Sequence, residues 1–168
     1  MHQKELISIF QRSEQLKSVQ ELLNGDKSKR INIQGIIGSS FALTAASIFE
    51  QTGGQQHLII LPDKEQAAYF YNDLENLFLE QETDHNKKRV LFFPTTYKRP
   101  YEPEKLDAAY QLSIAEVLNR FHEAKRKTIV VSYPQALAEK VITKRYLSKK
   151  AMKLRKGEQV SIDFIRDL

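Results

Sequence analysis

The residues with the most chemical potential in this sequence form the stretch GIIGSS, at positions 35–40, directly after the strand-like run INIQ. A phosphate-binding loop has the pattern G-x-x-x-x-G-K-[ST] between a strand and a helix. Its glycines let backbone N–H groups surround the phosphates, its lysine neutralises their charge, and its hydroxyl group holds Mg²⁺. The glycines and serines here predict a turn of this type at the start of a helix.

The groups that would perform the chemistry of such a loop are replaced. The positions that matter read Gly35, Gly38, Ser39, Ser40, Phe41 and Ala42. Ser40 stands for the second glycine, Phe41 for the lysine and Ala42 for the magnesium ligand. A serine is expected to cap the following helix, and Phe41 to join the core. Whether the loop is a degenerate nucleotide site or an ordinary strand–helix turn, we expect no catalytic residue, metal ion, cofactor or ATP hydrolysis here.

A second feature of the sequence is a block of positive charge. Between Lys140 and Gly157 the chain has eight basic residues and no acidic residue, while its net charge is +5. The candidate contacts in this block are Lys144, Arg145, Lys149, Lys150, Lys153, Arg155 and Lys156. Such a block binds nucleic acid or an acidic protein surface, or it forms a solvated lysine-rich face. The sequence leaves these interpretations open.

The composition excludes several classes of protein. The chain has 168 residues and no cysteine, which excludes disulfides and thiolate metal sites. Its four histidines lack the spacing of a metal site. Its apolar runs are shorter than the ~18–20 residues that span a bilayer, and the N-terminus lacks the pattern of a secretory signal. We therefore expect a cytoplasmic protein that does not contact membranes.

The elements that must position these residues alternate between helix and strand. Helices are predicted at 3–23, 39–51, 63–79, 107–124 and 134–142, and strands at 31–37, 58–61, 90–93 and 128–131. This alternation predicts an α/β fold, with a parallel sheet covered by helices on both faces and with 58–61 buried on both sides. Ligands of such sheets bind at the carboxyl ends of the strands. The candidate site loops are therefore 34–40, 61–64, 93–106 and 131–135.

The alternation stops near residue 145, which predicts two domains. Residues 1–145 form the α/β domain. Residues 146–168 are expected to begin a second, small α+β domain that is cut short at the end of the chain.

Four stretches in this order resemble the N-terminal, UvrB-like region of bacterial transcription-repair coupling factors, the Mfd family. They read INIQGIIGSSFAL, HLIILPDKEQAAYFYNDLE, RVLFFPTTYKRPYEP and TIVVSYPQALAEKVI, and MKLRKGEQVSIDFIRDL matches more weakly. The resemblance implies a degenerate P-loop NTPase fold without a nucleotide site. It also implies a parent protein that displaces stalled RNA polymerase from DNA, using ATP and Mg²⁺ in separate motor domains, and that recruits UvrA for nucleotide excision repair.

The chain departs from UvrB in one respect that limits this expectation. The long hairpin with which UvrB grips damaged DNA is reduced here to the short segment 94–103, so lesion gripping is not expected. Its residues Tyr97 and Tyr101 stack on bases or form part of a proline-stiffened loop. The UvrA contacts of the family would lie mainly beyond Leu168. The alternative functions are an active P-loop NTPase or helicase core, and a nucleic-acid-binding domain that uses the 140–157 block.

Overall fold

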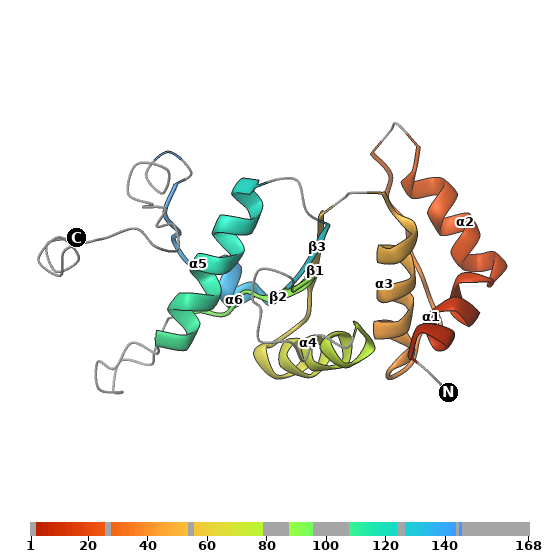
Figure 1. The fold of residues 1–168 in the computed structure, drawn as a ribbon, viewed down its shortest axis with the longest axis horizontal. Helices are drawn as coiled ribbons and strands as arrows, with labels where there is room; N and C mark the ends of the chain where they lie inside the picture. The colour runs from red at the N-terminus through yellow and green to blue at the C-terminus, as the bar shows by residue number, and fades with distance from the viewer. Residues whose placement is uncertain are drawn as a thin grey trace, which may run out of the picture.

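The computed structural model describes residues 3–25, 28–53, 56–78, 88–95, 108–123, 127–143 and 145 (Figure 1). Its helices are α1 (Gln3–Gln11), α2 (Glu14–Leu23), α3 (Ser40–Gln51), α4 (Lys64–Phe78), α5 (Ala108–Glu123) and α6 (Pro134–Leu137). Its strands are β1 (Gln56–Ile60), β2 (Val90–Phe92) and β3 (Thr128–Ser132). The predicted second domain at 146–168 lies outside the described residues.

The three strands form one parallel sheet in the order β1-β3-β2. Leu58 and Leu91 both lie opposite Val130, which fixes the register of the two outer strands on the central one. The crossovers between strands contain α4 and α5, as parallel connections require. The predicted α/β class and the predicted parallel sheet are thereby confirmed for the described residues.

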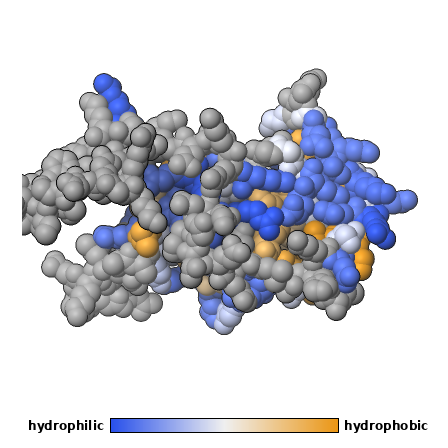
Figure 2. Space-filling model, in the orientation of Figure 1, coloured by the Kyte–Doolittle hydropathy of each residue, from blue (hydrophilic) through white to orange (hydrophobic). Residues whose placement is uncertain are grey.

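Helices lie on both sides of the sheet. Figure 1 shows α5 on one side, and α3 on the other side with α4 below it. The buried core between the sheet, α3 and α4 consists of aliphatic and aromatic side chains. Its members include Ala46, Phe49, Leu61, Phe70, Leu74, Val90, Ile129 and Val131. Figure 2 shows that the surface over α2 is hydrophilic, whereas hydrophobic surface appears near the centre of this face and beside α1.

The strand predicted at 31–37 is absent from the sheet. The segment is extended, and Figure 1 shows it passing on the side of α3 that faces away from the strands. Gly35 lies within it at a φ of 80°, a left-handed conformation that interrupts a strand. Ile33 and Ile37 consequently remain exposed. Of the four strands predicted from the sequence, the first one, at 31–37, is therefore wrong.

The N-terminal helix predicted at 3–23 is two helices. The N–H of Ser13 bonds to the carbonyl oxygen of Phe10 at 3.0 Å, which closes the last turn of α1. Ser13 then adopts an extended backbone and precedes α2. The apolar pattern has no member between Phe10 and Leu16, so packing does not oppose the break.

Two further predictions are corrected at the sheet and after it. The strand at 58–61 is buried on one face only, because Leu58 and Ile60 point to a face that no described helix covers. The helix predicted at 134–142 ends at Leu137, and Val141 and Ile142 are exposed. None of the described helices is both long and apolar enough to cross a membrane.

Candidate functional site

The loop at residues 35–40 has the backbone of a tight turn. Gly35 and Gly38 have φ values of 80° and 56°, which glycine adopts without strain. Both glycines are exposed, and a Cβ atom at either position would meet open space. α3 begins directly after them at Ser40. The predicted turn before a helix is confirmed, although no strand precedes it.

The polar groups of this loop bond to one another. The Ile37 N–H donates to the Ser40 hydroxyl oxygen at 3.0 Å, and that hydroxyl donates to the Ile37 carbonyl oxygen at 2.6 Å. The N–H groups of Ser40 and Phe41 donate to the carbonyl oxygens of Ile37 and Gly38 at 3.3 and 3.2 Å. A phosphate-binding loop turns such N–H groups toward the anion. Here these three donors are engaged inside the loop.

The serine cap expected for α3 does not form. Ser39 occupies the N-cap position, but its side chain makes no capping hydrogen bond and its backbone is helical. The Ser40 hydroxyl bonds backward to Ile37 instead of forward to the helix. The start of α3 is therefore stabilised by the turn rather than by a side-chain cap.

Phe41 extends from the position of the missing lysine onto α4. Its ring centroid lies 4.8 Å from that of Phe70, with an interplanar angle of 46°. Phe70 is buried, whereas Phe41 is 40% exposed, so it lies at the rim of the core. Ala42 is fully inside the core. The expectation that Phe41 joins the core is therefore wrong, because its ring packs on Phe70 at the rim and stays largely exposed.

A shallow pocket adjoins the loop between α1, α3 and α4. Its volume is about 240 Å³, below the ~300 Å³ at which ligand pockets usually begin. It is lined by Leu6, Ser39, Ala42, Leu43, Asp73, Asn76 and Leu77. The only ionisable side chain among them is a carboxylate, Asp73. A nucleotide phosphate placed here would meet negative charge and apolar walls, so the pocket disfavours a triphosphate.

The loops after the three strands meet at one end of the sheet. The Leu61 N–H donates to the Ser132 carbonyl oxygen at 2.9 Å, and the Ser132 hydroxyl donates to the Phe93 carbonyl oxygen at 3.0 Å. The Thr95 N–H donates to the hydroxyl oxygen of Tyr133, which is buried, at 3.1 Å. These polar groups hold the strand ends together. The predicted convergence of 61–64, the described part of 93–106, and 131–135 is confirmed, while 34–40 lies elsewhere.

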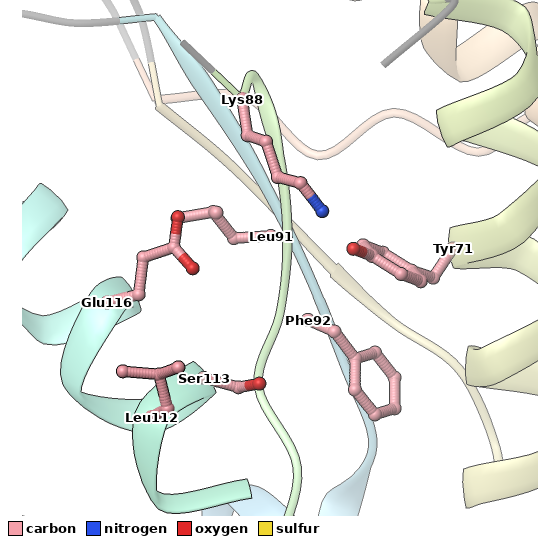
Figure 3. Close-up of a pocket in the computed structure, with 7 residues that line it drawn as sticks. All are labelled: Tyr71, Lys88, Leu91, Phe92, Leu112, Ser113 and Glu116. Atoms are coloured by element: carbon pink, nitrogen blue, oxygen red, sulfur yellow. The ribbon is translucent and has the colours of Figure 1, made fainter. Parts of the chain in front are cut away.

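A second pocket lies at the outer edge of β2, between α4 and α5. Its volume is about 90 Å³, and it is lined by Tyr71, Lys88, Leu91, Phe92, Leu112, Ser113 and Glu116 (Figure 3). Figure 3 shows Tyr71 and Lys88 on one side and Glu116 on the other. Glu75 accepts hydrogen bonds from the Tyr71 hydroxyl at 2.5 Å and from the Lys88 ammonium at 3.0 Å. The lysine charge is thereby neutralised, and the pocket is too small for a nucleotide.

The other end of the sheet carries a group of basic side chains around Phe49. Lys127 Nζ lies 4.7 Å from the Phe49 ring centroid and donates to the Glu50 carbonyl oxygen at 3.0 Å. His57 Nε2 lies 2.8 Å from the Thr52 hydroxyl. Burial, and then the Lys127 charge, lower the pKa of His57. Desolvation is also the main cause that lowers the pKa of Lys127. These contacts stabilise the end of α3, and they do not form a reaction centre.

Most of the basic block lies outside the described residues. This applies to Lys144, Lys149, Lys150, Lys153, Arg155 and Lys156, and to the tyrosines at 97 and 101. Lys140 and Arg145 are described, and both are exposed. Within the described part of the chain, no group of three or more histidine, aspartate and glutamate side chains is arranged to hold a metal ion.

Sequence reasoning missed the two α4 residues that complete the surroundings of the loop. Phe70 and Asp73 lie one helical turn apart, and Leu77 lies one turn further on the same face. The three-and-four spacing was visible in the sequence, and it places these residues together. The missing information was that this face of α4 packs beside the start of α3, which depends on the tertiary fold.

Comparison of the chain with family models, curated proteins and solved structures finds no match in any of the three.

Proposed function

We propose that the chain is a non-catalytic, UvrB-like docking module of a bacterial transcription-repair coupling factor. In this proposal its α/β fold is a degenerate P-loop NTPase domain in the cytoplasm. Motor domains elsewhere in the parent protein use ATP and Mg²⁺ to displace stalled RNA polymerase from DNA. The UvrB-like region recruits UvrA, mainly through residues beyond Leu168, and so begins nucleotide excision repair.

The observation that supports this function best is the contact of Phe41 with Phe70. A side chain at the lysine position of a phosphate loop packs on α4 at a centroid distance of 4.8 Å, and therefore contributes no charge to a nucleotide site. The engaged N–H groups of Ile37, Ser40 and Phe41 support the same conclusion. The order of the four stretches that resemble coupling factors supports the proposed family, and the loop supports the proposed absence of a nucleotide site.

Titration with Mg²⁺–ATP tests the loss of the nucleotide site. The expected result is no saturable rise in melting temperature, because a ligand that binds only the folded state must stabilise it by RT ln(1 + [L]/Kd). The matched variant combines Ser40→Gly with Phe41→Lys, which frees the Ile37 N–H and restores the cation. We expect this variant to bind inorganic triphosphate weakly and to hydrolyse no ATP. Saturable stabilisation or turnover by the natural sequence would contradict the proposal.

Capture of purified UvrA tests the partner. A longer form of the protein that continues past Leu168 should retain UvrA on an affinity resin, whereas residues 1–168 alone should retain much less. The control is the longer form with Phe41→Lys, which should bind UvrA equally well because the proposed contacts lie elsewhere. Failure of the longer form to bind UvrA would contradict the proposed role in repair. It would not bear on the proposed loss of the nucleotide site, which the ATP titration tests separately.

A further inference from the structure

The outer edge of β1 has open hydrogen-bonding groups. The Leu61 N–H bonds to the Ser132 carbonyl oxygen, and Ile59 lies opposite Val131. In a parallel ladder alternate residues bond to the same neighbour, so Ile59 and Leu61 are directed to β3 and Leu58 and Ile60 away from it. Among the described residues, no hydrogen bond joins the outward N–H and C=O groups of Leu58 and Ile60 to another segment.

The side chains of the same two residues are apolar and uncovered. Leu58 is 51% exposed and Ile60 is 53% exposed, although both belong to the sheet. Phe49 of α3 contacts His57 on the opposite face of β1, with ring centroids 5.3 Å apart. Helix α5 contacts β2, whereas Leu58 and Ile60 of β1 remain about half exposed. Among the described residues, one edge and one face of β1 are therefore both open.

The strand also lacks the features by which proteins usually protect an open edge. Such edges carry a lysine, a proline, a bulge or an inward-pointing charge that prevents pairing with another strand. β1 has the sequence QHLII, with no charged residue and no proline, and its pairing with β3 is regular. The outer edge of β2 differs, because side chains of α4 and α5 surround it (Figure 3).

We propose that the open edge of β1 pairs with β1 of a second copy of this chain, in antiparallel orientation about a two-fold axis at Leu58. Such an axis is perpendicular to the sheet, so Leu58 and Ile60 of both copies lie on the same face. Leu58 then faces its own equivalent, and Gln56 faces Ile60 of the second copy. About six backbone hydrogen bonds form between the copies, and they join two three-stranded sheets into one.

The charges near the two ends of β1 favour this antiparallel orientation. Asp63 follows the carboxyl end of the strand, and Lys127 lies beside its amino end, one residue before the Thr128 that pairs with Gln56. Antiparallel pairing brings the acidic end of one copy toward the basic end of the other. Parallel pairing would place like charges together at both ends. The charges of Asp63 and Lys127 therefore favour the antiparallel orientation over the parallel one.

Cross-linking tests the pairing, because the natural chain has no cysteine. Residues that face each other across a hydrogen-bonded antiparallel pair have Cα atoms about 5.5 Å apart, within the range of a disulfide. Leu58→Cys should therefore form a disulfide-linked dimer rapidly under mild oxidation. The matched control is Tyr69→Cys, which lies on α4 rather than in the sheet and replaces a residue that is 66% exposed. Equal cross-linking of the two variants would overturn the proposal.

Sedimentation of the natural chain provides the second measurement. Between about 1 and 100 µM the mass should rise from that of the 19.5 kDa chain toward twice that value. Leu58→Glu places two carboxylates opposite each other at the axis, and it should remain monomeric with an unchanged melting profile at low concentration. A natural chain that stays monomeric throughout this range, or a dimer that Leu58→Glu does not weaken, would overturn the proposal.

Discussion

Strands β1 and β3 have similar lengths and compositions, but they differ in how much of each strand is buried. Every residue of β3 is buried, whereas β1 alternates between partly buried and exposed positions. The reason is position in the sheet. β3 lies between two strands and between two helical layers, while β1 has one neighbour and one covered face. Hydrophobic composition alone therefore indicates a strand, but not how much of it is buried.

The largest difference between the two strands should appear on removal of an isoleucine side chain from each. Ile129→Ala in β3 removes a fully buried side chain from the core and should lower the free energy of unfolding by about 3 kcal/mol. Ile60→Ala in β1 removes a side chain that is 53% exposed, and should cost less than about 1 kcal/mol. Urea unfolding at low protein concentration measures both values.

Equal losses for the two variants would break this comparison. If Ile60→Ala were as costly as Ile129→Ala in the dilute chain, a segment outside the described residues would have to cover the Leu58 and Ile60 face. An unchanged denaturant slope is the control, because it shows that both variants unfold from an equally compact state.

The sequence predicted β2 and β3 better than β1 for a physical reason. The runs at 90–93 and 128–131 are short and apolar, and both became strands within one residue of the expected ends. The run at 58–61 gave the same signal, yet its burial depends on helices whose placement is not encoded locally. Periodicity specifies the type of an element, whereas the number of its neighbours is a property of the whole fold.

The loop at 35–40 shows the same limit at the candidate site. Its glycines correctly predicted a turn before a helix, because only glycine adopts the positive φ values found there without strain. The run Ile31–Gln34 has the alternation of a strand, but it is not paired in the described sheet. Pairing requires a free edge beside the segment, and α3 separates it from β1 (Figure 1). The contact of Phe41 with Phe70 also depends on tertiary packing.

A smaller effect should separate the two faces of β1 itself. His57 lies on the covered face, where burial and the charge of Lys127 lower its pKa below the usual 6.5. The unfolded chain then takes up a proton at a higher pH than the folded chain does. The neutral His57 side chain therefore contributes its full stabilisation above pH 6.5. This contribution is lost as the pH falls from 6.5 through the lower folded pKa. The free energy of unfolding should therefore decrease over this interval.

His57→Gln provides the matched comparison, since glutamine retains a polar partner for Thr52 but does not titrate. The difference in unfolding free energy between pH 8 and pH 5.5 should be smaller in this variant than in the natural chain. Proton NMR of the imidazole gives the folded pKa directly. A folded pKa equal to that of the unfolded chain would show that the covered face of β1 is open to water as well.

The smallest expected effect concerns the connection between β1 and α4. Asp63 accepts hydrogen bonds from the Gln66 N–H at 2.8 Å and from the Gln66 side-chain amide at 2.7 Å. Asp63 thereby caps the start of α4, and no such side-chain cap follows β3 at the start of α6. The backbone bond from Gln66 is the main cause that lowers the pKa of Asp63 below 3.8.

Because the folded pKa of Asp63 is depressed, its contribution is present above pH 3.8 and is lost as the pH falls through the lower folded value. Asp63→Ala should therefore melt at a lower temperature than the natural chain at pH 7, and the difference should diminish as the pH is lowered below that of the unfolded carboxyl. Asp63→Asn keeps an acceptor for the Gln66 N–H and should lie between the two at pH 7. If the alanine variant differed from the natural chain equally at both pH values, the carboxylate charge would have no part in the cap. The stability of the start of α4 would then depend on helix packing and not on the charge of Asp63.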